Sequence, residues 1–371
     1  MSLKVLPRPI NFDIGKTPIW QWERKDRAGP VAGKTAFVTG ATGFVGGHVA
    51  RLLVEQNWKV IALRREGSSN PYLSSVDLEW RSGDLRDSDR VRQAMAGCAV
   101  VFHVAADYRL WAPRPEEIYA TNVGGTVNVL QAAAAHAVER VVYTGSVGAL
   151  GLNRDGTPAN ESTPVALDDM VGHYKRSKFL AERKAEEYAL QGLPIVMVHP
   201  STPVGAGDHK PTPTGKIIVD FLNRRLPAYV DTGLNLVHVR DVAWGHLLAL
   251  EKGRLGEKYI LGNRNLRLPD IFRLLEEISG LPAPRIRLPH GLVLMLAHLN
   301  AWFSRVTGKE PRIPLEGVRM AHRFMFFDAS RAVRELGLPQ TPVEQALAEA
   351  VGWYVENGYA PHLPFTPCPR K

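Results

Sequence analysis

Up to residue 199 the chain alternates short apolar runs with longer segments whose apolar positions repeat at helical spacing. The short runs predict strands at residues 35–39, 59–63, 78–80, 99–104, 140–144 and 194–199. The longer segments predict helices over residues 44–55, 116–135 and 174–187. Strands of continuous apolar residues that alternate with helices indicate a parallel sheet covered on both faces. We therefore predict an α/β fold with a doubly wound parallel sheet, whose ligands bind beyond the carboxyl ends of the strands.

Outside this region the pattern changes twice. Residues 1–33 form an irregular arm interrupted by prolines at positions 7, 9, 18 and 30. After residue 200 prolines and glycines cluster, and short strands are expected at 236–239 and 258–261. Helices predominate from residue 269 to 358 and include an amphipathic stretch at 343–354. This second part reads as a smaller, mostly helical unit that covers a substrate.

Composition excludes several classes of protein. Cys98 and Cys368 are the two cysteines and form no Cys-x-x-Cys pattern, which argues against a disulfide framework or a zinc site and favours a reducing, cytoplasmic location. No secretory signal is visible. The net charge of +9 indicates either an anionic partner or scattered surface cations. The apolar window 291–303 is too short to span a bilayer, and reads as a buried core helix in preference to one lying on a membrane.

A glycine-rich turn joins the first strand to the first helix, in the sequence TGATGFVG at residues 39–46. Glycine permits a tight turn and close approach of the backbone to a pyrophosphate, and the helix N-terminus offers free N–H groups to it. The spacing is G-x-x-G-x-x-G. The predicted dinucleotide contacts in this turn are Gly40, Thr42, Gly43, Phe44, Val45 and Gly46.

Residues at the ends of the second and third strands indicate which dinucleotide the chain binds. Arg64 stands where an acidic residue would bind the ribose 2′-hydroxyl of NAD(H), and an arginine there suits the 2′-phosphate of NADP(H). We therefore expect NADP(H) in preference to NAD(H), with solvated surface arginines as the alternative. Asp84, followed by Leu85, is placed to accept a hydrogen bond from the adenine amine, although a plain turn aspartate reads almost as well.

Three polar residues predict proton transfer at the sheet edge. Tyr174 and Lys178 are four residues apart and share one helix face. An ammonium group beside a phenol lowers the pKa of the phenol, which would help Tyr174 to exchange protons near neutrality. Ser146, just past the fifth strand, is placed to hold a substrate carbonyl oxygen.

Together with GDLRD at 83–87, HVAA at 103–106 and NVGGT at 122–126, these motifs resemble the extended, epimerase-like branch of the short-chain dehydrogenase/reductase superfamily. The resemblance covers the chain from about residue 34 and implies a Rossmann-type fold, a catalytic triad of Ser146, Tyr174 and Lys178, and a structural role for Asn122. Relatives commonly form homodimers. The further cofactor contacts that the resemblance implies are Val104, Ala105, Ala106, Pro200 and Pro203.

Motifs at 108–113, 199–205, 210–215 and 230–235 are similar to those of hopanoid-associated sugar epimerases, a group related to dihydroflavonol 4-reductases. The resemblance implies that the substrate carries a sugar-like or polyol group. This group belongs either to a small molecule or to a lipid, as in the side chain of a hopanoid. The candidate substrate contacts are Tyr108, Arg109, Trp111, His209 and Lys210, with loop packing as the alternative for the two aromatic residues. His238 reads as a core histidine, and no metal site is expected.

The division expected from these motifs is an arm at 1–33, an NADP-binding domain at 34–200 and a substrate-binding part at 201–371, interleaved with the first through residues 236–262. A reductase is favoured, because Gly148 stands where epimerases carry Ser or Thr and because NADP(H) exchanges between turnovers. The alternatives are an epimerase that retains its cofactor and a non-enzymatic NADP-binding regulator. No nucleic-acid signature accompanies the basic charge, which leaves peripheral contact with the inner face of a membrane as a hypothesis.

Overall fold

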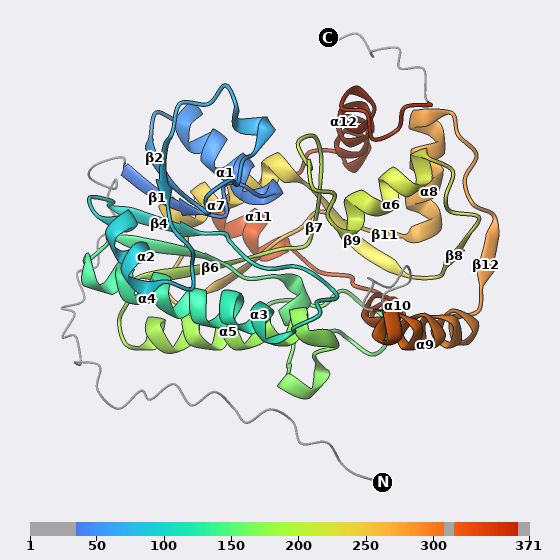
Figure 1. Cartoon of the computed structure of the whole chain (residues 1–371), viewed down its shortest axis with the longest axis horizontal. Helices are drawn as coiled ribbons and strands as arrows, with labels where there is room; N and C mark the ends of the chain where they lie inside the picture. The colour runs from blue at the N-terminus through green and yellow to red at the C-terminus, as the bar shows by residue number, and fades with distance from the viewer. Residues whose placement is uncertain (1–34, 308–314, 363–371) are drawn as a thin grey trace.

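The computed structural model describes residues 35–307 and 315–362 (Figure 1). The predicted arm at residues 1–33 lies outside the described residues. Within them the chain builds one large parallel sheet between two helical layers, and a second part beyond the carboxyl ends of its strands (Figure 1).

The large sheet has seven parallel strands in the order β10-β6-β5-β4-β1-β2-β3. Successive strands run outward from β1 to β3 on one side and then from β4 outward on the other, so the order reverses between β1 and β4. Ligands bind at this kind of crossing point in open α/β sheets. The strands are β1 (Thr35–Thr39), β2 (Lys59–Arg64), β3 (Glu79–Ser82), β4 (Val100–His103), β5 (Arg140–Thr144), β6 (Ile195–Pro200) and β10 (Lys258–Leu261).

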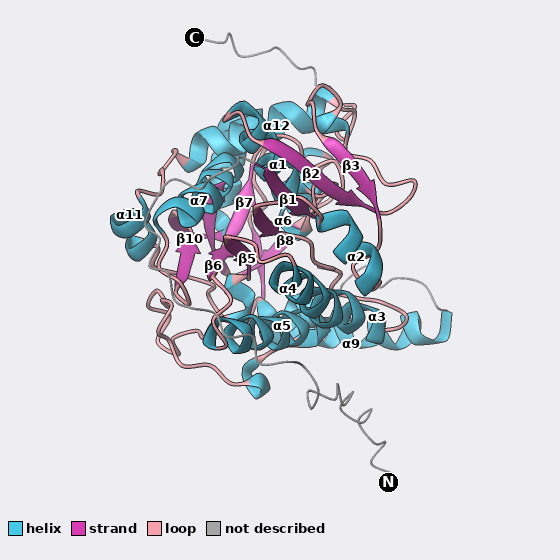
Figure 2. Ribbon diagram, turned by 90° about the vertical axis from the view of Figure 1, so that its left-hand side faces the viewer, coloured by secondary structure: helices cyan, strands magenta, loops and turns pink. Residues whose placement is uncertain are grey.

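Helices cover both faces of the sheet (Figure 2). One face packs against α1 (Phe44–Glu55), α7 (Val239–Lys252) and α11 (Ser330–Leu336). The opposite face packs against α2 (Ser88–Met95), α4 (Gly125–Ala135) and α5 (Gly172–Leu190). A short helix, α3 (Glu116–Tyr119), and one π-helical turn (Ala120–Gly124) lead into α4. Because both faces are buried, the inner strands are apolar at nearly every position, as the sequence predicted, whereas the edge strand β3 is mostly polar.

The second part contains two smaller sheets, in the orders β11-β9-β7 and β12-β8, with helices around them. Its strands are β7 (Thr202–Val204), β8 (Ala228–Val230), β9 (Gly233–His238), β11 (Arg264–Arg267) and β12 (Ile286–Leu288). Its helices are α6 (Pro213–Leu222), α8 (Leu268–Ser279), α9 (His290–Thr307), α10 (Leu315–Met320) and α12 (Val343–Glu356). Between β9 and β11 the chain returns to the large sheet, where it supplies α7 and the edge strand β10.

The structure corrects the interpretation of residues 291–303 as a buried core helix. They lie within α9, and Leu292, Met295, Leu296 and Leu299 are 41–60% exposed there. The opposite face of the helix packs Val293 and Ala297 against Val318 of α10. Within the described residues, no helix is both long and apolar enough to cross a bilayer.

Candidate active site

The glycine turn lies at the crossing point of the large sheet. Gly40 has a φ of +80°, and a Cβ atom there would lie 2.6 Å from the backbone nitrogen of Ala105, after β4. A Cβ atom at Gly46 would lie 2.2 Å from the carbonyl oxygen of Gly40. The turn therefore requires glycine at both positions. Gly43 caps α1 without a side-chain hydrogen bond, and the first turn of α1 carries no acidic residue.

This cradle fits a dinucleotide pyrophosphate. The first N–H groups of a helix point outward and attract negative charge, and no side chain of the turn competes for them. The other predicted contacts follow the same sheet edge: Val104, Ala105 and Ala106 after β4, Pro200 at the end of β6, and Pro203 in β7.

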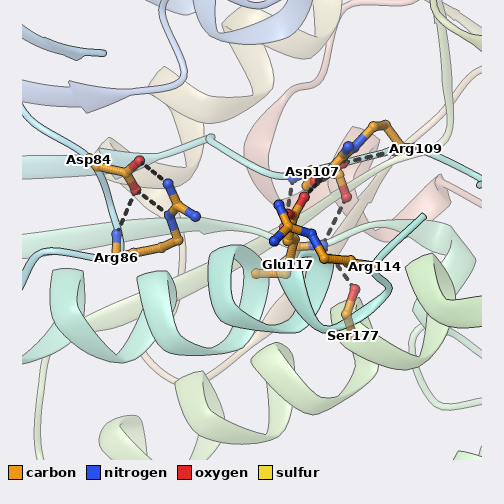
Figure 3. A network of polar contacts seen from close by, with 8 residues as sticks. Asp84, Arg86, Asp107, Arg109, Arg114, Glu117 and Ser177 are labelled. Atoms are coloured by element: carbon orange, nitrogen blue, oxygen red, sulfur yellow. Dashed lines mark hydrogen bonds and ion pairs between the residues drawn. The ribbon is translucent and has the colours of Figure 1, made fainter. Parts of the chain in front are cut away.

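The two residues assigned to adenosine recognition lie at the ends of neighbouring strands. Arg64 ends β2, and its guanidinium carbon lies 5.1 Å from the ring centroid of Trp80 in β3. Asp84 follows β3 and accepts hydrogen bonds from the backbone N–H, Nε and Nη2 of Arg86 (Figure 3). These bonds lower the pKa of Asp84, so it remains an acceptor.

Ser146 and Tyr174 come together after β5. The hydroxyl of Ser146 accepts a hydrogen bond from the N–H of Gly148 at 3.1 Å. Burial raises the pKa of Tyr174, and the nearby Ser146 hydroxyl opposes this rise. The structure thus corrects the expected lowering of the Tyr174 pKa by Lys178, because Lys178 directs its ammonium group elsewhere.

Lys178 is buried and donates from Nζ to the carbonyl oxygen of Thr144 at 2.7 Å. Burial lowers the pKa of Lys178 to about 8, with an opposing contribution from Glu182 one turn later. Thr144 is held in turn by His246, whose Nδ1 lies 2.7 Å from the carbonyl oxygen of Val242. Because that carbonyl only accepts, Nδ1 carries the proton, and His246 Nε2 accepts from the Thr144 hydroxyl at 2.9 Å.

A buried ion cluster lies behind this end of α5. Glu182 contacts His199 Nε2 at 2.8 Å and Lys258 Nζ at 2.5 Å. Burial tends to raise the pKa of Glu182, but the two partners together lower it to about 2. A Cβ atom at Gly145 would lie 2.6 Å from the His199 ring, so the cluster also requires a glycine immediately before Ser146.

Hydrogen bonds connect the glycine turn with α5. The Thr39 hydroxyl accepts from the N–H of Ala105 and lies 2.8 Å from His103 Nδ1. His103 Nε2 lies 3.0 Å from the Thr126 hydroxyl, which itself donates to the carbonyl oxygen of Asn122.

Asn122 completes the connection from the π-helical turn. Its side-chain amide donates to Ser177 of α5 and to the carbonyl oxygen of Asp107, and its amide oxygen accepts from the N–H of Asp107. These contacts agree with the structural role that the resemblance implied for Asn122.

The candidate substrate residues are only partly brought together. The Tyr108 hydroxyl donates to the carbonyl oxygen of Lys210 at 3.4 Å, which joins the loop after β4 to the loop before α6. The carbonyl oxygen of His209 accepts from the Tyr359 hydroxyl. Arg109 is held by Asp107 and Glu117, so its charge is already compensated (Figure 3). Trp111 is half-buried nearby.

A cavity of about 190 Å³ opens beside Ser146, and none of these five candidates lines it. Its polar lining comes from Arg154, Asp169, Lys175 and Arg323. Sequence reasoning missed these residues. Lys175 directly follows Tyr174 in the motif and could have been found there, whereas nothing local marks Arg323.

His238 is a satisfied core histidine, as predicted. It is 1% exposed, its Nε2 lies 3.1 Å from Glu349, and its Nδ1 accepts from the N–H of Arg240. Among residues 35–307 and 315–362, no group of three or more His, Cys, Asp or Glu side chains is arranged to hold a metal ion.

Comparison with known proteins places this geometry among related enzymes. The sequence profile described as the NAD dependent epimerase/dehydratase family matches residues 36–262. A candidate dihydroflavonol 4-reductase of Synechocystis sp. is 48% identical over 327 residues, which cover 87% of this chain and 95% of that protein. Sterol demethylase protein B of Methylococcus capsulatus is 35% identical over 326 residues, which cover 87% and 99%. The crystal structure of a nucleoside-diphosphate-sugar epimerase from Pseudomonas aeruginosa has a TM-score of 0.74 and 29% identity, and the match covers 88% of this chain and 98% of that one.

Proposed function

The chain belongs to the NAD dependent epimerase/dehydratase family and is an NAD(P)-dependent enzyme, and we propose that it reduces a carbonyl group on a lipid-linked sugar or polyol with NADPH. The observation that carries this proposal is the shared position of Ser146, Tyr174 and Lys178 at the sheet edge that also holds the glycine turn.

Each residue has a separate role in the proposed reaction. When bound, the dinucleotide supplies a hydride to the carbonyl carbon, or accepts one from the carbinol in the reverse direction. The Tyr174 O–H gives its proton to the carbonyl oxygen, while the Ser146 hydroxyl donates a hydrogen bond to the same oxygen and orients it. Lys178, held by the carbonyl oxygen of Thr144, provides positive charge and N–H groups for the ribose of the dinucleotide.

NADP(H) is proposed over NAD(H) because Arg64 and Arg65 at the end of β2 are cations and a carboxylate, Glu66, follows only after them. Arg64 is exposed, and within the described residues it forms no ion pair. A guanidinium group matches the charge and the geometry of a 2′-phosphate.

Reduction is proposed over epimerisation on the ground of Gly148. A Cβ atom at this position would lie 3.2 Å from the Ser146 hydroxyl and 3.6 Å from Cγ of Lys175. The further Ser or Thr that epimerases of this branch carry would therefore press against the Ser146 hydroxyl.

A polycyclic lipid is the substrate class we propose, with a hopanoid side chain as the specific case. One relative is named for action on sterols, which share a fused-ring skeleton with hopanoids. The exposed apolar face of α9 supports contact with a bilayer: its sequence contains no acidic residue, and the exposed Arg285 directly precedes β12, the strand that leads into α9. An apolar helix face beside cations is suited to the surface of an anionic membrane.

The decisive experiment follows NADPH consumption with the aldehyde form of a ribosyl hopanoid. We expect one NADPH to be consumed for each alcohol formed. Tyr174→Phe should abolish this consumption, while cofactor binding and the unfolding midpoint are retained. Tyr188→Phe, on the same helix, is the matched control and should keep the wild-type rate. An unchanged rate in Tyr174→Phe would overturn the mechanism. Altered product stereochemistry without net NADPH consumption would establish epimerisation instead.

A further inference from the structure

The cavity beside Ser146 contains an unusual concentration of positive charge. Lys175, Arg323 and Arg154 line it together with Asp169 and apolar or backbone groups. Within residues 35–307 and 315–362, none of the three cations lies within ion-pair distance of a carboxylate. Arg86 and Arg109, by contrast, are each paired with a carboxylate.

Lys175 is the member that needs a partner most. It is 8% exposed, and no hydrogen bond to its ammonium group occurs in the described part of the chain. Burial lowers its pKa to about 8, and repulsion from Arg323 contributes to the lowering. A buried ammonium group is costly unless an opposite charge compensates it.

Asp169 does not supply this compensation. Its Oδ2 accepts from the N–H of Ala166 at 2.9 Å, which directs the carboxylate to the short helical turn at Leu167–Asp169. The cavity therefore keeps a positive balance of two charges, if all four groups are ionised.

The cavity is also adjacent to the reacting groups. Gly148 lines it, and a Cβ atom at this residue would lie 3.2 Å from the Ser146 hydroxyl and 3.6 Å from Cγ of Lys175. Lys175 directly follows Tyr174 on α5. A substrate held by Ser146 and Tyr174 would thus extend into a pocket of positive charge.

We propose that this cavity is an anion subsite, in which Lys175 and Arg323 bind a carboxylate or phosphate group of the substrate. The proposal rests on the proposed function, since it adds a charged substituent to the carbonyl compound described above. Arg323 contributes a planar pair of donors, and Lys175 contributes a buried point charge, a combination that suits either oxyanion. Arg154, which is exposed, attracts the anion from the rim.

The test measures anion binding directly and does not depend on turnover. Protein saturated with NADP⁺ is titrated by calorimetry with potassium phosphate and with potassium acetate, against potassium chloride at equal ionic strength. Saturation with the cofactor blocks phosphate from the glycine turn. Binding of phosphate alone would assign a phosphate-type ligand, and binding of acetate would assign a carboxylate. Absence of heat with both anions would overturn the proposal.

Variants of the lining residues test whether the anion that calorimetry detects binds in the cavity. Lys175→Met and Arg323→Gln should each weaken anion binding at least tenfold, since each removes one charged hydrogen-bond donor. Arg323 is exposed, so Arg323→Gln keeps the test decisive if Lys175→Met fails to fold. Lys216→Met, an exposed single-charge change on α6, should leave anion binding unchanged. Equal affinity in wild type and in both cavity variants would overturn the proposal.

The outcome is separable from the fate of the proposed function. Wild-type protein that reduces the neutral hopanoid aldehyde but binds neither anion would refute only the subsite. Protein that binds an anion through Lys175 and Arg323 but never consumes NADPH would refute only the proposed reaction.

Discussion

The ammonium group of Lys178 lies 2.7 Å from the carbonyl oxygen of Thr144, across the gap between α5 and the end of β5. The contact fixes the lysine relative to Ser146, which follows Thr144 by two residues. It also explains why Lys178 stays buried as a cation, since a backbone carbonyl and the nearby Glu182 both favour the charged form.

Cofactor binding should depend on pH through Lys178. Its pKa lies near 8 instead of 10.5, so the ammonium charge is present below about pH 8 and is lost as the pH rises through that value. We expect the Kd for NADP⁺ to increase about tenfold or more between pH 7 and pH 9.5, since a charged hydrogen bond contributes about 1.5–3 kcal/mol. In Lys178→Met the Kd should be high and independent of pH over this range. A wild-type Kd that stays constant with pH would contradict this role.

Acid should weaken the fold through Glu182. Its pKa is lowered from 4.5 to about 2 in the folded protein, so its contribution to stability is complete above about pH 4.5 and disappears as the pH falls towards 2. Glu182→Gln should lower the free energy of unfolding at pH 7 by about 3–5 kcal/mol, because Lys258 and His199 lose a buried partner. It should also flatten the decline between pH 5 and pH 2. Urea denaturation measures both effects.

The control for that series is Glu187→Gln, on the same helix. Glu187 pairs with Lys184 at the surface, so a change of at most about 1 kcal/mol is expected. A loss in Glu182→Gln that matches the control would show that the buried cluster contributes nothing.

The glycine turn should reject any side chain at Gly46. A methyl group there would lie 2.2 Å from the carbonyl oxygen of Gly40, so Gly46→Ala must displace backbone. We expect a loss of about 1–3 kcal/mol in unfolding free energy and failure to bind NADPH. Gly124→Ala is the matched control: it has helical angles and no atom within 4 Å of the new methyl group, and it should stabilise by about 0.4–1 kcal/mol. Equal midpoints for both variants would refute the close contact.

Arg64 should determine the choice of dinucleotide. Arg64→Gln removes the cation at the end of β2, and we expect the Kd for NADPH to rise about tenfold to a hundredfold. The Kd for NADH, which has no 2′-phosphate, serves as the internal reference and should change little. Fluorescence titration with the two cofactors measures the ratio, and an unaltered ratio would remove the support for NADP(H).

Helix α9 should bring the protein to anionic membranes. Leu296→Gln combined with Leu299→Gln removes two exposed apolar side chains, and we expect less protein to sediment with vesicles rich in phosphatidylglycerol. The matched control combines Leu190→Gln and Leu255→Gln, which are also exposed but lie elsewhere. Equal sedimentation of both double variants would contradict a membrane role for α9.

The large sheet and the glycine turn were predictable because their signals are local. Strands buried on both faces need continuous apolar residues, and the spacing of Gly40, Gly43 and Gly46 lies within a single turn. The strand predicted at 78–80 occupies Glu79–Ser82, and the strand predicted at 236–239 occupies Gly233–His238. Both strands exist, but their predicted bounds differ from the observed ones by a few residues. Helices α2, α6 and α7 were not predicted.

Features that depend on distant partners were not predictable. Lys175 and Arg323 come together only in the folded chain. The ion pairs of Arg109 with Asp107 and Glu117 join nearby residues, but they depend on the conformation of the loop between them. The raised pKa of Tyr174 follows from burial, which the Tyr-x-x-x-Lys spacing does not encode. The apolar composition of α9 alone did not show whether other elements of the fold cover the helix.

Strand β10 has a consequence for how the protein is made. It completes the nucleotide-binding sheet beside β6, yet the ribosome synthesises it only after β7, β8 and β9 of the second part. Until Leu261 has emerged, β6 is an open edge with unpaired backbone groups. A nascent chain that stops near residue 200 therefore exposes an unpaired strand edge that is prone to aggregate, and the large sheet is complete only after β7, β8 and β9 of the second part have been made.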